Sequence, residues 1–297
     1  FSAPPTPSTE KLFMVQSATQ KFVFDTFIQP LPYFHADPFT LLAFDVPLPE
    51  GTRHEYWRYL VTTLLMGPVM FAVQTFAVSI LSGEWKKKGK LKDAFLRETK
   101  TTIVGLTMGA PIISYVYKLM FEGRLGQLYF DISDHSLMWG FVWAPLLWAV
   151  IADATFYWSH RTCHEIPFLY AWSHKNHHAA RPSTSFAGNA ADVFDLTFTG
   201  YSNTVMGAIL IPMHAKMFLV LSVFNQLWAV GLHCFERWQL GYYINDAHLH
   251  GVHHHYGRTN YNFGLYFQFW DRVMGTYKAN VTKGGKVVEM YSTPKED

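Results

Sequence analysis

Long uncharged apolar runs alternate along the chain with short polar segments, a pattern that predicts helices crossing a membrane. The first run, Leu60–Ser82, has 23 residues and no charge, enough to cross about 30 Å of hydrocarbon at about 1.5 Å per residue. Thr101–Tyr117 and Ser136–Ala152 are uncharged runs of 17 residues each, short but plausible with their flanks. Leu196–Met213 and Met217–Leu232 form a later pair, which we expect to be two spans or one re-entrant hairpin.

The polar segments between these runs suggest an orientation. Glu84–Lys100 carries seven Lys or Arg, so we predict a loop that stays on the cytosolic or matrix side. An out-and-back pair of spans then returns the chain to that side at His160. We predict an all-α, multi-pass membrane helical protein with a histidine-rich metal-binding cap on the cytosolic or matrix side. Its parts are an extended proline-rich arm (1–56), a membrane domain (57–277) and a polar tail (278–297).

Composition strengthens the membrane interpretation. Charged residues make up 15% of the chain and hydrophobic residues 49%, whereas about a quarter of the residues of soluble domains are charged. The formal charge of +2 is too small to indicate nucleic acid as a partner. Cys163 and Cys234 lie in no CxxC pair, so we expect them to pack structurally.

Histidines supply the candidate chemistry. Ten of the fifteen lie in two windows, 159–178 and 248–255, at spacings that place imidazoles on one helix face and so build metal sites. Eight occur in patterned groups, too many for one ion, so we predict two ions. His233 closes an apolar run on the same side and is a ninth candidate. The predicted metal ligands are His160, His164, His174, His177, His178, His233, His250, His253 and His254.

Other residues near these patterns are candidates for supporting roles. Asp153 and Tyr157 fall on the helical stripe of His160 and His164, so we expect them to orient an imidazole. His248 and His255 flank the second pattern and are either ligands or supporting residues. Isolated histidines are more often surface or interface residues, and we assign that role to His35, His54, His135 and His214. Ligand softness alone leaves zinc, copper and iron open.

The stretches YWSHRTCHEIPFLYAWSHKNHH, HGVHH and NYNFGLYFQFWDRVMGTY resemble the fatty acid hydroxylase and sterol desaturase superfamily of integral membrane di-iron enzymes. Within it the chain most resembles the sterol C5-desaturases, over residues 153–277. The resemblance implies that the eight patterned histidines bind two iron ions and that His233 matches an intermediate histidine. It also implies a structural role for the closing segment, with Asn262, Gly264, Trp270, Asp271 and Arg272.

The chain departs from the family pattern at two places. Asp192 stands where the resemblance places a histidine, although the acidic residue three positions later is present as Asp195. Two extra residues also separate His254 from the NYNFG stretch. We expect Asp192 and Asp195 to bind a metal or orient one of its ligands.

The resemblance implies O2-dependent hydroxylation or desaturation of a lipid or sterol. On ligand chemistry, zinc is another candidate occupant of the site. No GxGxxG, CxxCH or P-loop occurs, so electrons are expected from a carrier such as cytochrome b5. The family favours the endoplasmic reticulum. A chain that begins Phe-Ser is also compatible with a removed presequence and the mitochondrial inner membrane. The alternative function is a structural or accessory subunit of a larger membrane complex, for example a respiratory one. A zinc hydrolase is disfavoured because the chain has no HExxH motif.

Overall fold

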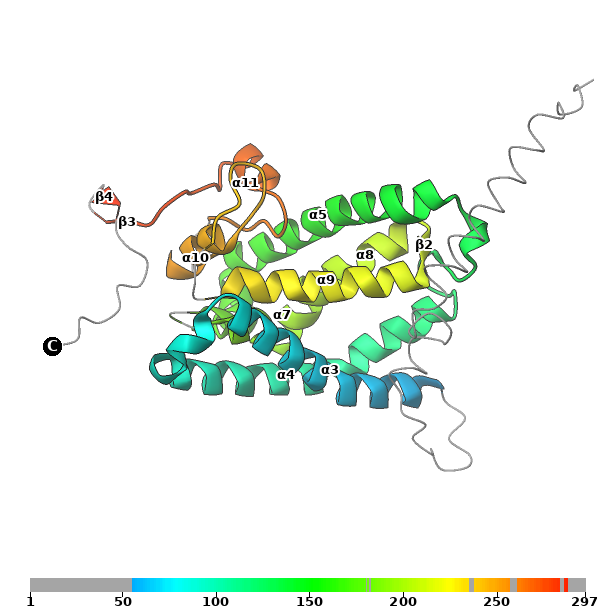
Figure 1. Ribbon diagram of the computed structural model, residues 1–297, viewed down its shortest axis with the longest axis horizontal. Coiled ribbons are helices and arrows are strands. Elements are labelled where there is room, and N and C mark those ends of the chain that lie inside the picture. Colours follow the sequence, from blue (N-terminus) through cyan, green and yellow to red (C-terminus); the bar gives the residue numbers. More distant parts are fainter. Residues whose placement is uncertain are drawn as a thin grey trace, which may run out of the picture.

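The computed structural model describes residues 55–179, 181, 183–234, 238–256, 261–283 and 286–287. The predicted arm lies outside the described residues except for its last two positions, and the predicted tail is described only in part. The described part of the chain contains four long helices, which Figure 1 shows lying along the molecule. They are α3 (Glu55–Leu81), α4 (Lys88–Phe121), α5 (Ala144–Glu165) and α9 (Ala215–His233). Helices α3 and α4 pack as one pair, and α5 and α9 flank the shorter α8 (Ser202–Leu210).

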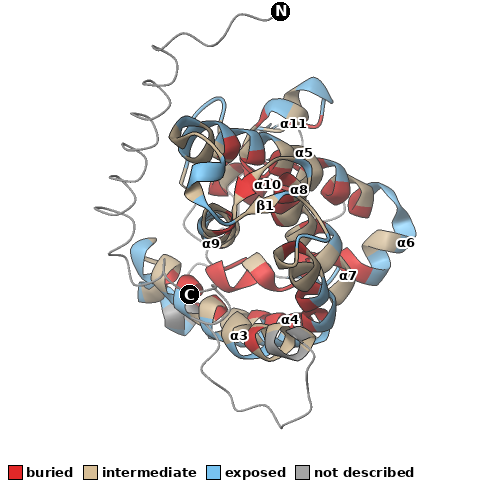
Figure 2. Cartoon of the chain, turned by 90° about the vertical axis from the view of Figure 1, so that its right-hand side faces the viewer, coloured by how far each residue is buried: buried red, intermediate tan, exposed pale blue. Residues whose placement is uncertain are grey.

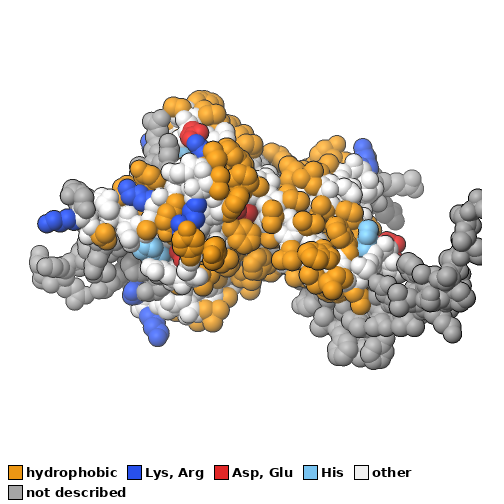
Figure 3. Space-filling view, turned by 90° about the horizontal axis from the view of Figure 1, so that it is seen from above, with side chains coloured by type: hydrophobic (Ala, Val, Ile, Leu, Met, Phe, Trp, Pro, Cys, Tyr) orange, Lys and Arg blue, Asp and Glu red, His pale blue; other side chains and the backbone are white. Residues whose placement is uncertain are grey.

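Four helical segments are long and apolar enough to cross a bilayer: Tyr59–Leu81, Leu91–Phe121, Trp139–Glu165 and Ala215–His233. Many of their apolar side chains face outward, including Ile80 and Met108, which are 60% and 63% exposed. Figure 3 shows this apolar surface across the middle of the molecule, with most of the visible Lys and Arg near one end. The predicted all-α, multi-pass membrane architecture is confirmed.

The lysine-rich segment is helical, so the predicted loop over Glu84–Lys100 is wrong. A 3₁₀ turn, η2 (Glu84–Lys87), leads directly into α4 at Lys88. Lys, Leu, Ala, Arg and Glu dominate this segment and are all good helix formers. The positive charge of this segment indicates on which side of the membrane it lies, and it does not argue against a helix.

The predicted apolar run Leu196–Met213 does not form a spanning helix. Helical structure is continuous through the 3 residues of α7 (Val193–Asp195), the 6 of the π-helix η8 (Leu196–Tyr201) and the 9 of α8. Together they extend about 27 Å, less than about 30 Å of hydrocarbon. Chain direction changes after Leu210, before Pro212. Gly207 lets α8 approach α5, since a Cβ there would lie 2.3 Å from Cδ1 of Trp148. The Trp148 indole N–H also donates to the Thr204 carbonyl at 2.9 Å.

Shorter elements connect the long helices. The helical ones are η3 (Ile132–Asp134), η4 (Trp139–Trp143), α6 (Pro167–Leu169), η5 (Tyr170–His174), η6 (His177–Ala179), η7 (Ser185–Asn189), α7 (Val193–Asp195), α10 (Ala247–Tyr256) and α11 (Phe269–Val273). Strands β1 (Leu128–Tyr129) and β2 (Met213–His214) pair in parallel, and β3 (Thr282–Lys283) pairs antiparallel with β4 (Lys286–Val287).

The 3₁₀ turn η7 joins the α3–α4 pair to α9. A Cβ on Gly188 would lie 2.8 Å from Cα of Val230, so glycine permits close contact with α9. On the other side, the buried carboxylate of Glu84 accepts hydrogen bonds at 3.1 Å from the backbone N–H of Ser185. The start of α4 therefore lies at the same end of the molecule as the histidine segment that precedes η7.

Candidate metal centre

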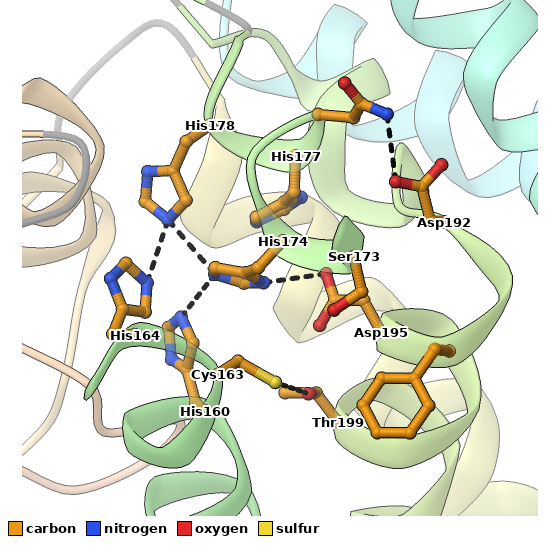
Figure 4. Close-up of polar contacts among 12 residues, drawn as sticks. His160, Cys163, His164, Ser173, His174, His177, His178, Asp192, Asp195 and Thr199 are labelled. Atoms are coloured by element: carbon orange, nitrogen blue, oxygen red, sulfur yellow. Dashed lines mark hydrogen bonds and ion pairs between the residues drawn. The ribbon is translucent and has the colours of Figure 1, made fainter. Parts of the chain in front are cut away.

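Nine buried histidines lie at this end of the bundle, in two groups. The first group contains His160 and His164 of α5, His174 of η5, His178 of η6 and His253 of α10. Within it one ring nitrogen from each residue lies within 4.8 Å of all the others. Four of these rings are drawn in Figure 4, which shows them turned toward one another. Residues far apart in the sequence thus present five nitrogens to one point.

The second group contains His177 of η6, His233 at the end of α9, and His250 and His254 of α10. Adjacent residues belong to different groups, because neighbouring side chains on a turn point in different directions. His177 and His178 are divided in this way, as are His253 and His254. The two groups touch, since the His178 and His254 rings are stacked with centroids 4.5 Å apart. In Figure 2 α10, which contributes to both, is largely buried.

The outer nitrogens of several rings fix their tautomers. His174 Nδ1 lies 2.8 Å from a carboxylate oxygen of Asp195, and His253 Nδ1 lies 2.7 Å from the Tyr261 carbonyl. His160 Nδ1 lies 3.2 Å from the Phe263 carbonyl. Carbonyl and carboxylate oxygens only accept, so each Nδ1 donates its hydrogen. The Nε2 of each neutral ring therefore carries a lone pair directed into the group.

These inward lone pairs face one another. His160 Nε2 and His174 Nε2 are 3.2 Å apart, and because both are acceptors the contact is not a hydrogen bond. His178 Nε2 lies 3.1 Å from the Nε2 atoms of His164, His174 and His253. A single hydrogen there would satisfy one contact at most. A cation coordinated by the lone pairs removes this repulsion, so the donor set fits a metal ion.

The spacing of the nitrogens agrees with this conclusion. Imidazole nitrogens bind transition metals at about 2.0–2.1 Å, so neighbouring ligands on one ion lie about 2.9–3.4 Å apart. In the second group the Nε2 atoms of His233 and His177 are 3.1 Å apart, and those of His250 and His233 are 2.9 Å apart. His254 Nε2 lies 3.1 Å from His250 Nε2. Both groups therefore have the separations of ligands around a single ion.

Burial keeps these imidazoles neutral. It lowers the pKa of His177 to about 4, with a further contribution from nearby His174. Burial likewise lowers the pKa of His253 to about 3, although the hydrogen bond to Tyr261 opposes the shift. The pKa values of His178, His250 and His254 are also lowered, first by burial and then by neighbouring histidines. At neutral pH these rings have the unprotonated nitrogen that a metal requires.

The two acidic candidates differ in position. Asp195 is buried and bonds His174, as Figure 4 shows. Burial alone would raise the pKa of Asp195, but His174 and the hydrogen bonds outweigh it and lower the pKa. Asp192 instead accepts a hydrogen bond at 2.9 Å from the Asn176 amide and belongs to neither group. Asp195 therefore contacts a histidine of the first group, whereas Asp192 contacts Asn176.

Asp153 and Tyr157 do not orient an imidazole directly, which corrects the prediction from the helical stripe. One oxygen of Asp153 accepts the backbone N–H groups of Leu265, Tyr266 and Phe267 at 3.2, 2.7 and 3.1 Å. The Tyr157 hydroxyl lies 2.9 Å from the Thr276 hydroxyl. These partners lie more than a hundred residues away, out of reach of a periodicity argument. The Tyr157 hydroxyl also accepts a hydrogen bond at 3.3 Å from the Arg161 guanidinium on its own helix.

The closing segment positions His160. Asp271 accepts the backbone N–H groups of Phe263 and Gly264 at 2.9 and 2.8 Å, which fixes the Phe263 carbonyl that bonds His160. Asn262 has a positive φ of 55°, a conformation that asparagine tolerates better than most residues. Its amide donates to the carbonyls of Leu249 and Lys278 at 3.0 and 2.7 Å. Sequence reasoning assigned these residues a structural role and missed their link to His160.

The remaining histidine candidates lie outside both groups. His248 bonds the Ala279 carbonyl at 2.8 Å, and the His255 ring contacts Tyr256. His214 caps α9 by accepting the N–H of Lys216, and the His135 ring contacts Tyr129. His35 and His54 lie outside the described residues. These histidines differ from the nine of the two groups in the burial and the direction of their side chains, neither of which sequence spacing reveals.

A small cavity adjoins the histidines. Its walls include His160, His177 and His233, together with Asn203 and Asn225. Its volume is about 60 Å³, well below the roughly 300–1,000 Å³ of typical ligand pockets. A lipid can enter only if side chains or helices around the cavity move.

Comparison with known proteins places this arrangement in a family. Residues 145–276, which include all nine histidines, match the model of the fatty acid hydroxylase family. Lathosterol oxidase of Rattus norvegicus is 30% identical over 209 residues, which cover 68% of this chain and 67% of that protein. The chain belongs to the fatty acid hydroxylase family. This confirms the superfamily resemblance read from the histidine motifs.

Other members of the fatty acid hydroxylase family are similar over different lengths. The Delta(7)-sterol 5(6)-desaturase ERG3A of Gibberella zeae is 24% identical over 296 residues, covering 86% of this chain and 84% of that protein. The Delta(7)-sterol 5(6)-desaturase of Eremothecium gossypii is 35% identical over 136 residues, covering 45% of this chain and 37% of that protein. No solved structure matches the chain. The relatives support a lipid or sterol oxidoreductase embedded in a membrane.

Proposed function

We propose that this protein uses O2 and two externally supplied electrons to hydroxylate or desaturate a lipid or sterol at a pair of iron ions. The observation that carries the proposal is the pair of histidine groups, whose facing Nε2 lone pairs require cations. Two adjoining ions suit O2 chemistry better than a single structural ion would. The named activities of the relatives supply the substrate class.

An iron pair would supply, when bound, the oxidant that removes hydrogen from an unactivated C–H bond, a step no side-chain base performs. The ligands of one ion would be His160, His164, His174, His178 and His253, and those of the other His177, His233, His250 and His254. Asp195 orients His174, and the Phe263 carbonyl orients His160. If the side chains around it move apart, the small cavity beside His160 and His233 would bring the reacting carbon close to both groups. Zinc is the alternative occupant that we keep for these ligands.

The electrons would come from a separate carrier, such as cytochrome b5. The described surface at the histidine end carries most of the Lys and Arg seen in Figure 3, which suits an acidic donor. We place this end on the cytosolic side of the endoplasmic reticulum by the positive-inside rule and by analogy with the sterol desaturases. The mitochondrial inner membrane, with the same end in the matrix, is the alternative location.

Replacing His177 tests the proposal. We expect H177A to lower bound iron, measured by elemental analysis, and to abolish oxidation of a sterol supplied with O2 and an electron donor. H248A is the matched control, since His248 also lies in α10 but belongs to neither group, and its ring bonds the Ala279 carbonyl. Iron content unchanged in H177A, with the fold intact, would refute the metal assignment.

The alternative role is an accessory subunit of a larger membrane complex that keeps the fold. The feature that favours it is Asp192, which stands where the family resemblance places a histidine and lies outside both nitrogen groups. Purification from the native membrane separates the two roles. Stable isolation with a larger assembly and no lipid turnover by the purified complex would favour the accessory role.

A further inference from the structure

A second, larger cavity lies on the outer surface of α3 and α4, away from the histidines. Its volume is about 720 Å³, and its walls come from the end of α3, from η2, from the first turns of α4 and from Phe186 of η7. This volume falls within the range of sites that hold lipid-sized ligands. The proposed oxidation makes no use of it.

The wall of this cavity is a cluster of aromatic rings. Phe186 contacts Phe76 and Phe95 with ring centroids 5.3 and 4.7 Å apart. Trp85 contacts Phe76 and Phe95 at 5.3 and 6.2 Å. Because the rings hold one another in place, they form a preformed apolar surface suited to a hydrocarbon chain.

Two lysines lie at the rim, Lys92 and Lys100, both exposed. They are eight residues apart on α4, which is about 80° around the helix, and Leu96 lies between them. Neither forms an ion pair with any residue that the structure describes. Glu98 points elsewhere, since it is buried and bonds the Thr184 hydroxyl. The rim therefore presents positive charge that the described protein does not neutralise.

The cavity opens where a membrane has its headgroups. Lys92 and Lys100 lie in the first turns of the spanning segment Leu91–Phe121. The next turn exposes apolar side chains toward lipid, with Ile103 and Val104 at 45% and 50% exposure. Charge at the rim and hydrocarbon-compatible surface below it match the two parts of an amphiphile. Basic pockets beside spanning helices on the positively charged side bind anionic lipid headgroups.

We propose that this cavity binds one anionic phospholipid, with its phosphate between Lys92 and Lys100 and an acyl chain against Phe76, Trp85, Phe95 and Phe186. Turn η7 connects this site to the metal centre. Its Phe186 side chain lines the outer cavity, whereas Gly188 and Asn189 line the inner one. A bound phospholipid would stabilise the wall between the two cavities.

Native mass spectrometry of the purified protein in detergent tests this site. The probes are phosphatidylglycerol, phosphatidylcholine with the same acyl chains, glycerol phosphate as the headgroup alone, and cholesterol. We expect retention of phosphatidylglycerol over phosphatidylcholine, and a loss of roughly 10- to 30-fold in phosphatidylglycerol affinity in K92Q/K100Q. The charge-matched control is K86Q/K87Q in η2, whose lysines are exposed outside the cavity wall; it should bind normally.

Three results would overturn the proposal. Equal retention of phosphatidylcholine would show that headgroup charge is not recognised, and glycerol phosphate binding as tightly as the lipid would show that the aromatic wall is not used. Preferential retention of cholesterol would identify the cavity as a site for neutral sterols. Because the lysines lie outside the metal centre, bound metal should be the same in K92Q/K100Q and wild type, so this test is independent of the proposed oxidation.

Discussion

Asp195 is the residue whose replacement tests the organisation of the metal centre most finely. Its carboxylate accepts the Nδ1–H of His174 at 2.8 Å, and both side chains are buried. This bond directs the Nε2 lone pair of His174 into the five-histidine group. In D195N the side chain keeps its shape but loses its charge, and an amide N–H facing Nδ1 would favour the tautomer that places hydrogen on Nε2. In the Nε2–H tautomer the His174 Nε2 lone pair is no longer available, so the ion would be bound less strongly by one of its five ligands.

The expected cost follows from the role of such supporting groups. Replacing a group that orients a metal-bound histidine lowers metal affinity by about 10- to 100-fold, which is about 1.4–2.7 kcal/mol. We would measure it by competition with a graded series of chelators, following the loss of one of two ions. D192N is the matched control, because Asp192 is three residues away and bonds Asn176. It should change metal affinity by less than about twofold.

The reasoning would be refuted if D195N bound both ions as tightly as wild type while its melting temperature was unchanged. It would be equally refuted if D192N lowered metal affinity as much as D195N. Loss of the ion from the four-histidine group alone would show that Asp195 supports a different ligand from the one the structure indicates.

Three further perturbations test the surrounding structure. D153A leaves the backbone N–H groups of residues 265–267 without their acceptor. We expect the free energy of unfolding to fall by several kcal/mol, at about 1–3 kcal/mol per group. Thermal or detergent denaturation should show a smaller loss in D153N. G207A places a Cβ 2.3 Å from the Trp148 ring and should destabilise the protein by about 1–3 kcal/mol, whereas G67A, with nothing within 4 Å, should not destabilise it. Removing metal with a chelator should lower the melting temperature, because no cation then offsets the repulsion between the facing lone pairs. Adding Fe²⁺ should restore the melting temperature. A melting temperature that the chelator leaves unchanged would contradict the argument from these lone pairs.

The sequence was sufficient for the membrane architecture because apolar run length is a local property. The uncharged run in Leu60–Ser82 reappears as the spanning segment Tyr59–Leu81. The uncharged run Ser136–Ala152 ends at the charge of Asp153, but the helical stripe from Asp153 to His164 predicted that the helix continues, and α5 extends to Glu165. What the stripe did not indicate is that the Asp153 carboxylate is buried against backbone N–H groups.

The sequence was enough to predict which histidines belong to the candidate site, but not how they are divided between two ions. Spacing brought His160 and His164 onto one helix face and indicated two ions. It did not indicate which histidines share an ion, because that depends on how η6 and α10 meet in space. The fixed tautomer of His160 depends on the Phe263 carbonyl, a contact across 103 residues. Spacing also did not separate Asp195 from Asp192, since only burial and direction distinguish them.

Counting metal ions tests the central claim most directly. Elemental analysis of the protein purified from its native membrane, combined with anomalous scattering from crystals, would give the identity, number and position of the ions. We predict two iron ions per chain, one surrounded by His160, His164, His174, His178 and His253 and the other by His177, His233, His250 and His254. A chain that contains no transition metal, or that holds a single ion shared between the two groups, would contradict this account.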